Sequence, residues 1–268
     1  DDYEYESDQF KINGFDDRWL SSQFQSLSSD FVIFSEKGKV IQCFDKESNK
    51  VFKLKSEESF DVSCFVASNS YLLTAPETSS INVYTDKNLV VPINTHEFFQ
   101  SPALCAAISE SFHTIVIGSE GRLIVTPLES GSSMMAIDID GYTPLNIVIT
   151  ENFGFVVTHA MKVIDGKVVK ILFLHNIDGK LLSKKIVSIE IDLIIQWSDR
   201  DGIDYLAVTD ESGKIMVGEA YELTFPNIVK RCMSQIVSMK YSKLLKSLVA
   251  VTVNGNIFIE PVFSKNNI

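Results

Sequence analysis

One short pattern recurs along this chain and restricts its fold more than any other feature. An almost continuously apolar run of six or seven residues occurs at residues 62–67, 103–108, 144–149, 192–197 and 235–241. The starts of these runs are separated by 41 to 48 residues. Self-similarity at a period of this length indicates repeated supersecondary units that bury their apolar faces against one another. The chain is therefore expected to consist of copies of one small structural unit.

Each of these runs is followed by a second apolar run, a turn and a third run. The turns contain dipeptides typical of tight hairpins, including Glu120-Gly121, Asp165-Gly166 and Asn254-Gly255. Residues 30–45 supply one more such unit, which brings the total to six. The apolar residues do not follow a helical period in any window of helical length. We therefore expect an all-β chain that forms a β-propeller with six recognisable four-stranded blades, to which a seventh could be added only as a divergent blade.

The position of a strand within a blade predicts how its apolar residues are distributed. The first strand of each unit is expected to be innermost and covered on both faces, which would explain its continuous apolar run. Third strands should lie nearer the rim and alternate, as residues 214–217 and 256–259 do. In the stretch ITENFGFVVTH, residues 151–154 are interpreted as the bend between an innermost strand and the strand that returns beside it.

The last unit shows only three strands before the chain ends, so its outer strand is unfilled. We expect residues 9–13 (QFKIN) to supply it, which would close the ring and remove open sheet edges. On this interpretation residues 1–268 form a single propeller domain, in which the acidic residues 1–20 contain the closing strand. Because the chain begins with Asp1 rather than Met, we expect it to be the C-terminal part of a longer protein.

Charge and cysteine usage argue against several classes of protein. A net charge of −11 opposes general binding to nucleic acid, which needs a basic face to neutralise phosphates. The cysteines are far apart and form no Cys-x-x-Cys pair, which is typical of buried thiols in a reducing compartment; they are Cys43, Cys64, Cys105 and Cys232. The sequence shows neither a signal-peptide pattern nor an apolar run long enough to span a bilayer. We expect a cytoplasmic protein with no nucleic-acid partner.

The residue pattern offers no catalytic or metal-binding constellation. The histidines have neither helical i, i+4 spacing nor a shared strand that would gather metal ligands; they are His96, His113, His159 and His175. The acids of residues 199–210 invite a calcium interpretation, but Ile203 and Asp204 stand where an EF-hand loop needs an oxygen ligand and a glycine. A solvated hairpin explains these acids equally well. We therefore predict no catalytic residue, no cofactor and no metal site.

Two features carry a resemblance to known families. The third strands end at Thr126-Pro127 and Glu260-Pro261, where a regular WD repeat has Trp-Asp, so the units resemble degenerate WD repeats and imply a WD40-like propeller. The segments ESFHTIVIGSEGRLIVTPLESG and PLNIVITENFGFVVTH make residues 103–182 similar to the C-terminal WD-like propeller of BEACH-domain proteins. That resemblance implies a large cytosolic protein in which the propeller follows a BEACH module and acts in vesicle traffic, lysosome-related organelles or autophagy.

The leading interpretation is a non-enzymatic scaffold whose loops bind protein partners or an adjacent domain of the same chain. Loops that lead into the blades, at residues 94–101, 139–144 and 226–235, are expected to form the recognition face. The apolar anchors predicted there are Phe98, Phe99, Tyr142 and Phe225, with ordinary packing between blades as the alternative for each. A coat or pore scaffold would instead expose an apolar patch and self-associate. An enzyme acting at the central channel would need acidic groups or histidines on the innermost strands, which offer only Asp192.

Charge is distributed unevenly along the chain. Residues 1–17 carry seven acids against Lys11, whereas residues 228–250 carry five basic side chains and no acid. Lys230 and Arg231 are expected in the loop that leads into the last blade, where they would bind an acidic partner segment or make weak contact with an anionic membrane surface. Solvated surface and contact with the acidic N-terminus are the alternatives. The expected location is therefore cytoplasmic, with peripheral contact with membranes left open.

Overall fold

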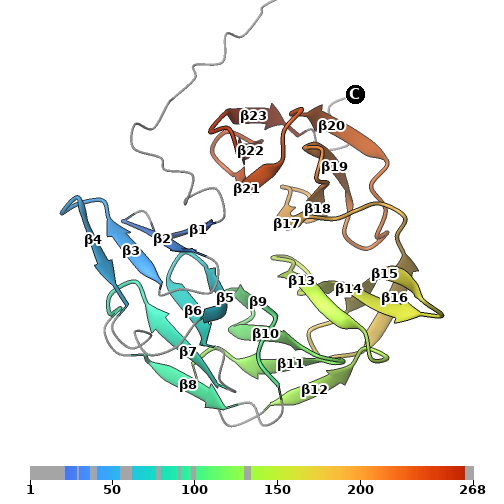
Figure 1. Cartoon of the computed structure of the whole chain (residues 1–268), viewed down its shortest axis with the longest axis horizontal. Coiled ribbons are helices and arrows are strands. Elements are labelled where there is room, and N and C mark those ends of the chain that lie inside the picture. Colours follow the sequence, from blue (N-terminus) through green and yellow to red (C-terminus); the bar gives the residue numbers. More distant parts are fainter. Residues whose placement is uncertain are drawn as a thin grey trace, which may run out of the picture. The chain divides into compact units, whose positions relative to one another are not determined.

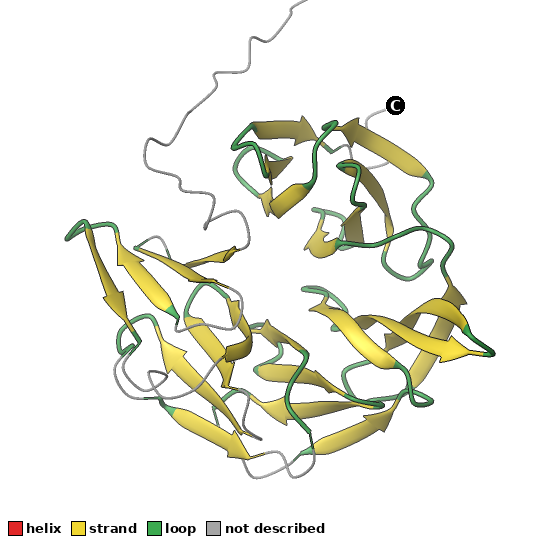
Figure 2. Cartoon of the chain, viewed as in Figure 1, coloured by secondary structure: helices red, strands yellow, loops and turns green. Residues whose placement is uncertain are grey.

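Strands account for all regular secondary structure in the part of the chain that the structure describes. The computed structural model describes residues 22–28, 30–36, 41–54, 62–76, 80–89, 92–97, 101–129 and 134–262, and these residues contain 23 strands and no helix (Figure 2). It follows that none of them belongs to a helix capable of crossing a membrane. The predicted all-β fold is confirmed.

The strands form small antiparallel sheets in two compact units, one of Ser21–Ser188 and one containing Ile189–Ile268. We call each four-stranded sheet a blade and number the blades along the chain. Every blade is a meander in which strands consecutive in sequence are paired, as the labels in Figure 1 show. Short hairpins between neighbouring strands produce this order directly from the spacing of the turn dipeptides.

The unit of residues 21–188 contains blades 1 to 4. Blade 1 consists of β1 (Ser22–Leu27), β2 (Phe31–Glu36), β3 (Gln42–Asp45) and β4 (Lys50–Lys53). Blade 2 consists of β5 (Val62–Ala67), β6 (Tyr71–Pro76), β7 (Ser80–Thr85) and β8 (Asn94–Glu97). Blade 3 consists of β9 (Cys105–Ser109), β10 (Thr114–Ser119), β11 (Arg122–Pro127) and β12 (Met135–Asp138). Blade 4 consists of β13 (Thr143–Ile149), β14 (Val156–Ile164), β15 (Lys167–His175) and β16 (Leu181–Ile186).

The unit containing residues 189–268 holds blade 5 and a three-stranded sheet. Blade 5 consists of β17 (Leu193–Ser198), β18 (Asp204–Thr209), β19 (Lys214–Glu219) and β20 (Asn227–Arg231). The three-stranded sheet consists of β21 (Ile236–Ser242), β22 (Ser247–Thr252) and β23 (Ile257–Pro261). Trp197 of β17 stacks on Tyr205 of β18 and on Tyr241 of β21, with centroid distances of 5.4 and 5.3 Å. These aromatic contacts join the two sheets of this unit.

The number of complete blades among the described residues is five, not the six or seven predicted from the sequence. The sixth unit recognised in the sequence provides only three strands. Residues 9–13, which were predicted to add the fourth strand, lie outside the described residues. The closure of the ring by this segment therefore stays a prediction.

The order of strands within each unit is confirmed, but the explanation for the apolar first strands is wrong. The first strands β9 and β13 contain buried and half-buried residues in near alternation. The second strands are better covered, since β10 is buried at five of six positions and β18 likewise. The third strand β19 is buried at residues 215–218 instead of alternating. A first strand forms one edge of its sheet, whereas the two central strands are flanked by strands on both sides and are therefore buried more completely.

Residues 151–154 form the predicted bend between β13 and β14. The Thr150 N–H donates to the Phe155 carbonyl (2.9 Å), and the Thr150 hydroxyl accepts from the Phe155 N–H (3.0 Å). Gly154 has a φ of +65° and faces the ring of Phe112, so a side chain at this position would be strained and would meet that ring. These two features allow a short connection between two apolar strands.

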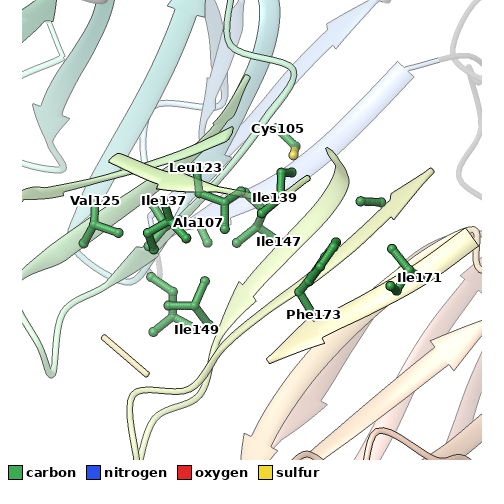
Figure 3. Close-up of a cluster of buried hydrophobic side chains, with 13 residues drawn as sticks. Cys105, Ala107, Leu123, Val125, Ile137, Ile139, Ile147, Ile149, Ile171 and Phe173 are labelled. Carbon is green, nitrogen blue, oxygen red and sulfur yellow. The ribbon is translucent and has the colours of Figure 1, made fainter. Parts of the chain in front are cut away.

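Blades 3 and 4 share one apolar cluster, which Figure 3 draws as sticks with ten of its residues labelled. The cluster consists of Cys105, Ala107, Val116, Leu123, Val125, Ile137, Ile139, Ile147, Ile149, Val156, Ala160, Ile171 and Phe173. Full burial of an aliphatic side chain contributes about 1.5–3 kcal/mol, so a cluster of this size holds the two blades firmly together. Blade 4 is therefore anchored to blade 3 through its buried side chains, and its outer strand lies away from this cluster.

Candidate interaction surface

The structure describes two of the four apolar anchors predicted from the sequence. Phe98 and Phe99 lie outside the described residues, and residues 94–97 of their predicted loop form strand β8. Tyr142 and Phe225 are both half-buried. Binding roles for all four residues stay predictions.

Tyr142 lies in the connection between β12 and β13, at the junction of blades 3 and 4. Its ring makes an edge-to-face contact with Phe173, with 5.5 Å between the centroids. The Lys162 ammonium lies 5.5 Å from the centre of the Tyr142 ring and donates to the Asp140 carbonyl (2.7 Å). These contacts favour the alternative interpretation of Tyr142, which is packing between blades.

Phe225 lies in the segment between β19 and β20. The backbone of this segment packs directly over Gly218, where a Cβ atom would overlap with the Thr224 carbonyl oxygen. The missing side chain at Gly218 therefore lets the segment approach β19 closely. As a result, the Phe225 ring is held half-buried beside blade 5.

Lys230 and Arg231 lie in strand β20, not in the loop predicted for them. Lys230 forms an ion pair with Glu260 of β23, and its ammonium lies 5.5 Å from the centre of the Phe258 ring. Arg231 is exposed and lies opposite Lys214 in the register of β19 and β20. Lys230 thus joins blade 5 to the three-stranded sheet, whereas Arg231 remains on the surface.

Two of the acids of residues 199–210, Asp199 and Asp210, shape hairpin turns. The Asp199 carboxylate accepts hydrogen bonds from the N–H groups of Asp201 (3.0 Å) and Ile203 (2.9 Å). Asp210 accepts in the same way from the N–H of Ser212 (3.0 Å). Within the described ranges, three His, Cys, Asp or Glu side chains do not gather anywhere as metal ligands would. Asp199 and Asp210 therefore shape their turns, as the hairpin interpretation expected, whereas Asp204 lies buried in β18 and accepts a hydrogen bond from the Ser198 hydroxyl.

The buried histidines and cysteines favour their neutral forms. Burial lowers the pKa of His159 to about 4, with a smaller effect from Lys170, and burial also lowers the pKa of His175. The described cysteines are all free, and burial raises the pKa of Cys43 and of Cys64 to about 12. An imidazole that resists protonation and thiols that resist ionisation are poorly suited to acid–base or nucleophilic chemistry.

Blade 4 differs from the other blades because its central hairpin is long. β14 and β15 have nine residues each, and beyond Met161 and Lys170 they pair only with each other. The resulting two-stranded arm ends in the turn at Asp165-Gly166. Its aliphatic residues are exposed: Val163 at 65%, Ile164 at 41% and Val168 at 58%.

The outer strand of the same blade, β16, is exposed at all six positions. Leu181, Leu182 and Ile186 are exposed at 45%, 39% and 71%. The outer strands of the other four blades have only four or five residues. Proteins usually protect sheet edges with short strands, because a long apolar edge invites pairing with another chain. β16 departs from that protection.

The same region is basic in an acidic chain. Between residues 162 and 186 there are six lysines against two aspartates, a local charge of +4 in a chain whose net charge is −11. Lys184 forms an exposed ion pair with Asp140 at 3.1 Å. We use the term blade 4 surface for the exposed side chains of Val163, Ile164, Lys167, Val168, Lys180, Leu181, Leu182, Lys184, Lys185 and Ile186.

The blade 4 surface was not predicted from the sequence, where the basic residues of 228–250 were taken as the candidate basic patch. The stretch LLSKKI (181–186) falls where the repeat places an outer strand, yet it carries three large aliphatic residues. An apolar rim strand beside lysines is a signal that could have been found. The exposure of the β14–β15 arm could not have been predicted in this way, because it depends on β14 and β15 being longer than β13 and β16.

Comparisons with known proteins support the fold. No protein-family model matches the sequence, and no curated protein matches it. A solved chain described as "Crystal Structure of Mitotic Checkpoint Complex" is similar with a TM-score of 0.70, over 94% of this chain and 78% of that chain, at 12% identity. Because 1378 solved chains match, the likeness identifies a widespread fold and not one function. This chain has a WD40-like β-propeller fold, as its degenerate repeats predicted.

Proposed function

We propose that this chain is a non-enzymatic scaffold that binds protein partners through the blade 4 surface. The observation that carries the proposal is the set of exposed aliphatic side chains on β16 and the β14–β15 arm, interspersed with lysines. Exposed apolar patches with a polar rim are typical of protein interaction sites. The similar solved chain belongs to a mitotic checkpoint complex, and membership of a complex is in keeping with a role in assembly.

An enzyme acting at the innermost strands is a weaker candidate. The one acid noted there from the sequence, Asp192, lies directly before β17 and accepts a hydrogen bond from the Gln235 amide (3.0 Å). The buried His159 and His175 lie on β14 and β15, and burial holds both imidazoles neutral. Catalysis would need such groups to converge on a substrate at accessible positions. WD40-like propellers are typically scaffolds, and the arrangement here agrees with that role.

The resemblance of residues 103–182 supports a more specific proposal. We propose that the chain is the propeller of a BEACH-type protein that works in the cytoplasm in vesicle traffic, lysosomal processes or autophagy. An adjacent domain of the same chain is then a candidate partner beside other proteins. Weak contact with anionic membranes belongs to the same proposal, because Lys167, Lys185 and Arg231 are exposed.

Affinity capture with the purified protein tests the scaffold function. The bait is compared with a blade 4 variant, Leu181→Ser with Ile186→Ser, and with a control variant, Val51→Ser with Ile228→Ser. The control residues lie in the outer strands of blades 1 and 5 and are exposed at 54% and 48%. A further variant, Phe98→Ala with Phe99→Ala, examines the loop face predicted from the sequence.

We expect specific partners to be retained by the control and lost by the blade 4 variant, with the captured proteins identified by mass spectrometry. Partners lost only from the Phe98 and Phe99 variant would move the site to the loop face while keeping the scaffold function. A bait that captures nothing above background would contradict the scaffold function. BEACH-containing or vesicle-associated proteins among the partners would support the trafficking role.

A coat or pore scaffold is a second candidate, because it predicts the exposed apolar patch that blade 4 carries. It also predicts self-association through that patch. Sedimentation of the purified protein over a range of concentrations separates the two candidates. A concentration-dependent oligomer that the Leu181→Ser and Ile186→Ser changes dissociate would favour the coat, and a monomer would favour the partner-binding scaffold.

A further inference from the structure

We infer that β16 binds an acidic, extended peptide of a partner protein, which adds to blade 4 as a fifth antiparallel or parallel strand. The inference rests on the proposed scaffold function and names the chemistry of the partner. It follows from three properties of β16: an outer edge that pairs with no strand of the described residues, its exposed aliphatic residues and the lysines around it. Strand addition of this kind obtains affinity from main-chain hydrogen bonds and specificity from alternate side chains.

The register of β15 and β16 shows which backbone groups face outward. Ile186 lies opposite Ile171, and the next pair is joined by a bond from the Val187 N–H to the Lys170 carbonyl (3.0 Å). Hydrogen-bonded and non-hydrogen-bonded pairs alternate along an antiparallel ladder. The backbone N–H and C=O groups of Lys184 and Ile186 therefore point away from β15, toward the open edge, where a new strand would bind them.

The charges around this edge identify the partner as acidic. Lys180 and Lys185 are exposed, and Lys167 is exposed at the tip of the neighbouring arm. Carboxylates on an added strand could pair with these ammonium groups. Such pairs would speed the encounter with the peptide and fix its register on β16 more than they would raise the affinity. The aliphatic Leu181, Leu182 and Ile186 would cover the apolar residues of the same peptide.

A second copy of this chain fits the edge less well. Pairing of β16 with another β16 would place the Lys184 and Lys185 side chains of two copies close to one another. Like charges directly opposite in a sheet are destabilising. Charge therefore disfavours self-pairing and favours a partner that supplies acids.

A membrane surface also fits less well. The turn at the tip of the β14–β15 arm contains the Asp165 carboxylate, ahead of the exposed Val163 and Val168. Inserting this tip would carry a negative charge into an anionic interface. A lipid surface also cannot satisfy the outward backbone groups of β16, whereas a peptide strand can.

Binding of a fluorescent peptide to the full chain, followed by fluorescence anisotropy, tests the inference. The probe is a peptide of about ten residues in which Glu and Val alternate, since strands of this length match natural strand addition. The matched probe has Lys in place of Glu. We expect saturable binding of the acidic probe alone, with affinity that falls as salt is raised.

Two variants distinguish the contribution of backbone hydrogen bonds to peptide binding from the contribution of the lysine charges. Ile186→Pro removes one outward N–H without removing a lysine, and proline is tolerated at a sheet edge where the N–H is not used. Lys180→Glu with Lys185→Glu reverses two charges and leaves the backbone intact. Each variant should weaken binding at least tenfold, whereas the control Lys87→Glu with Lys240→Glu should leave it within twofold. Circular dichroism establishes that each variant is folded.

Several outcomes would overturn the inference. Equal binding of the acidic and lysine probes, or binding unaffected by both β16 variants, would show that β16 is not the site. Tighter binding after deletion of residues 1–8 would show that the acidic N-terminus of the chain, and not a partner, is the occupant. Binding to phosphatidylserine vesicles that both β16 variants abolish, without peptide binding, would assign the surface to lipid. If affinity capture still yields partners in any of these cases, the scaffold function stands without the inference.

Discussion

At the scale of single residues, the ionisation of His159 is coupled to folding near neutral pH. Both of its ring nitrogens are buried without a hydrogen-bond partner, and burial lowers its pKa to about 4. The unfolded chain, with an ordinary imidazole, takes up a proton at a higher pH than the folded chain does. Stability is therefore fully present at neutral pH and is lost as the pH falls from about 6.5 toward about 4.

This coupling predicts that unfolding becomes easier by about 3 kcal/mol between pH 7 and pH 4 through His159 alone. The measurement is urea unfolding at several pH values for the protein and for His159→Leu, which removes the ionisable group from the same buried site. The pH dependence of the variant should be shallower over this window. Parallel curves for the two proteins would show that His159 does not contribute.

At the scale of strands, we expect the second strand of a blade to provide more of the stability than the first, because β10 and β18 are buried more completely than β9 and β17. In blade 3, Ile115 of β10 lies opposite Ile108 of β9 in the register. Ile115 is 0% exposed, while Ile108 is half-buried at the edge of the same apolar cluster. The two residues have the same chemistry and differ in burial, so they form a matched pair.

We predict that Ile115→Ala costs about 3–4 kcal/mol and Ile108→Ala about half as much, because the cost of removing buried methyl groups rises with burial and with the cavity left behind. Denaturant unfolding of both variants measures the difference. Equal costs would mean that the first strand is as well packed as the second, as the sequence pattern had suggested.

The sequence predicted the strands well because their signals are local. Apolar runs and dipeptides such as Asp165-Gly166 set the positions of strands and turns without reference to distant residues. It predicted burial less well, because consecutive apolar residues occur in first strands that are only partly covered. The contacts of Lys230 with Glu260 and Phe258 join strands far apart in sequence, and no local pattern reports them. The exposure of the β14–β15 arm was missed because it depends on the length of these strands relative to their neighbours, although the apolar stretch at residues 181–186 could have been recognised.

At the scale of the whole molecule, the open question is what completes the last sheet. Every other sheet in the described residues has four strands, but β21–β23 has three. Along β23, Ile257 and Ile259 are exposed at 36% and 54%, alternating with half-buried residues. An exposed apolar edge of this kind is one that proteins usually cover. The alternating QFKIN of residues 9–13 has the pattern of a strand that would cover it.

We therefore predict that deletion of residues 1–13 exposes β23, whereas deletion of residues 1–8 does not. Hydrogen exchange of the amides in Ile257–Pro261 measures the effect, because a paired edge protects amides that an open edge leaves to solvent. The longer deletion should raise their exchange rates at least tenfold, and the shorter one should leave them unchanged. The shorter deletion removes five of the seven acids of residues 1–17 but keeps the predicted strand, so it separates charge from pairing. Equal exchange in both truncated proteins would mean that the sheet is completed by something other than residues 9–13, and that the termini are not joined.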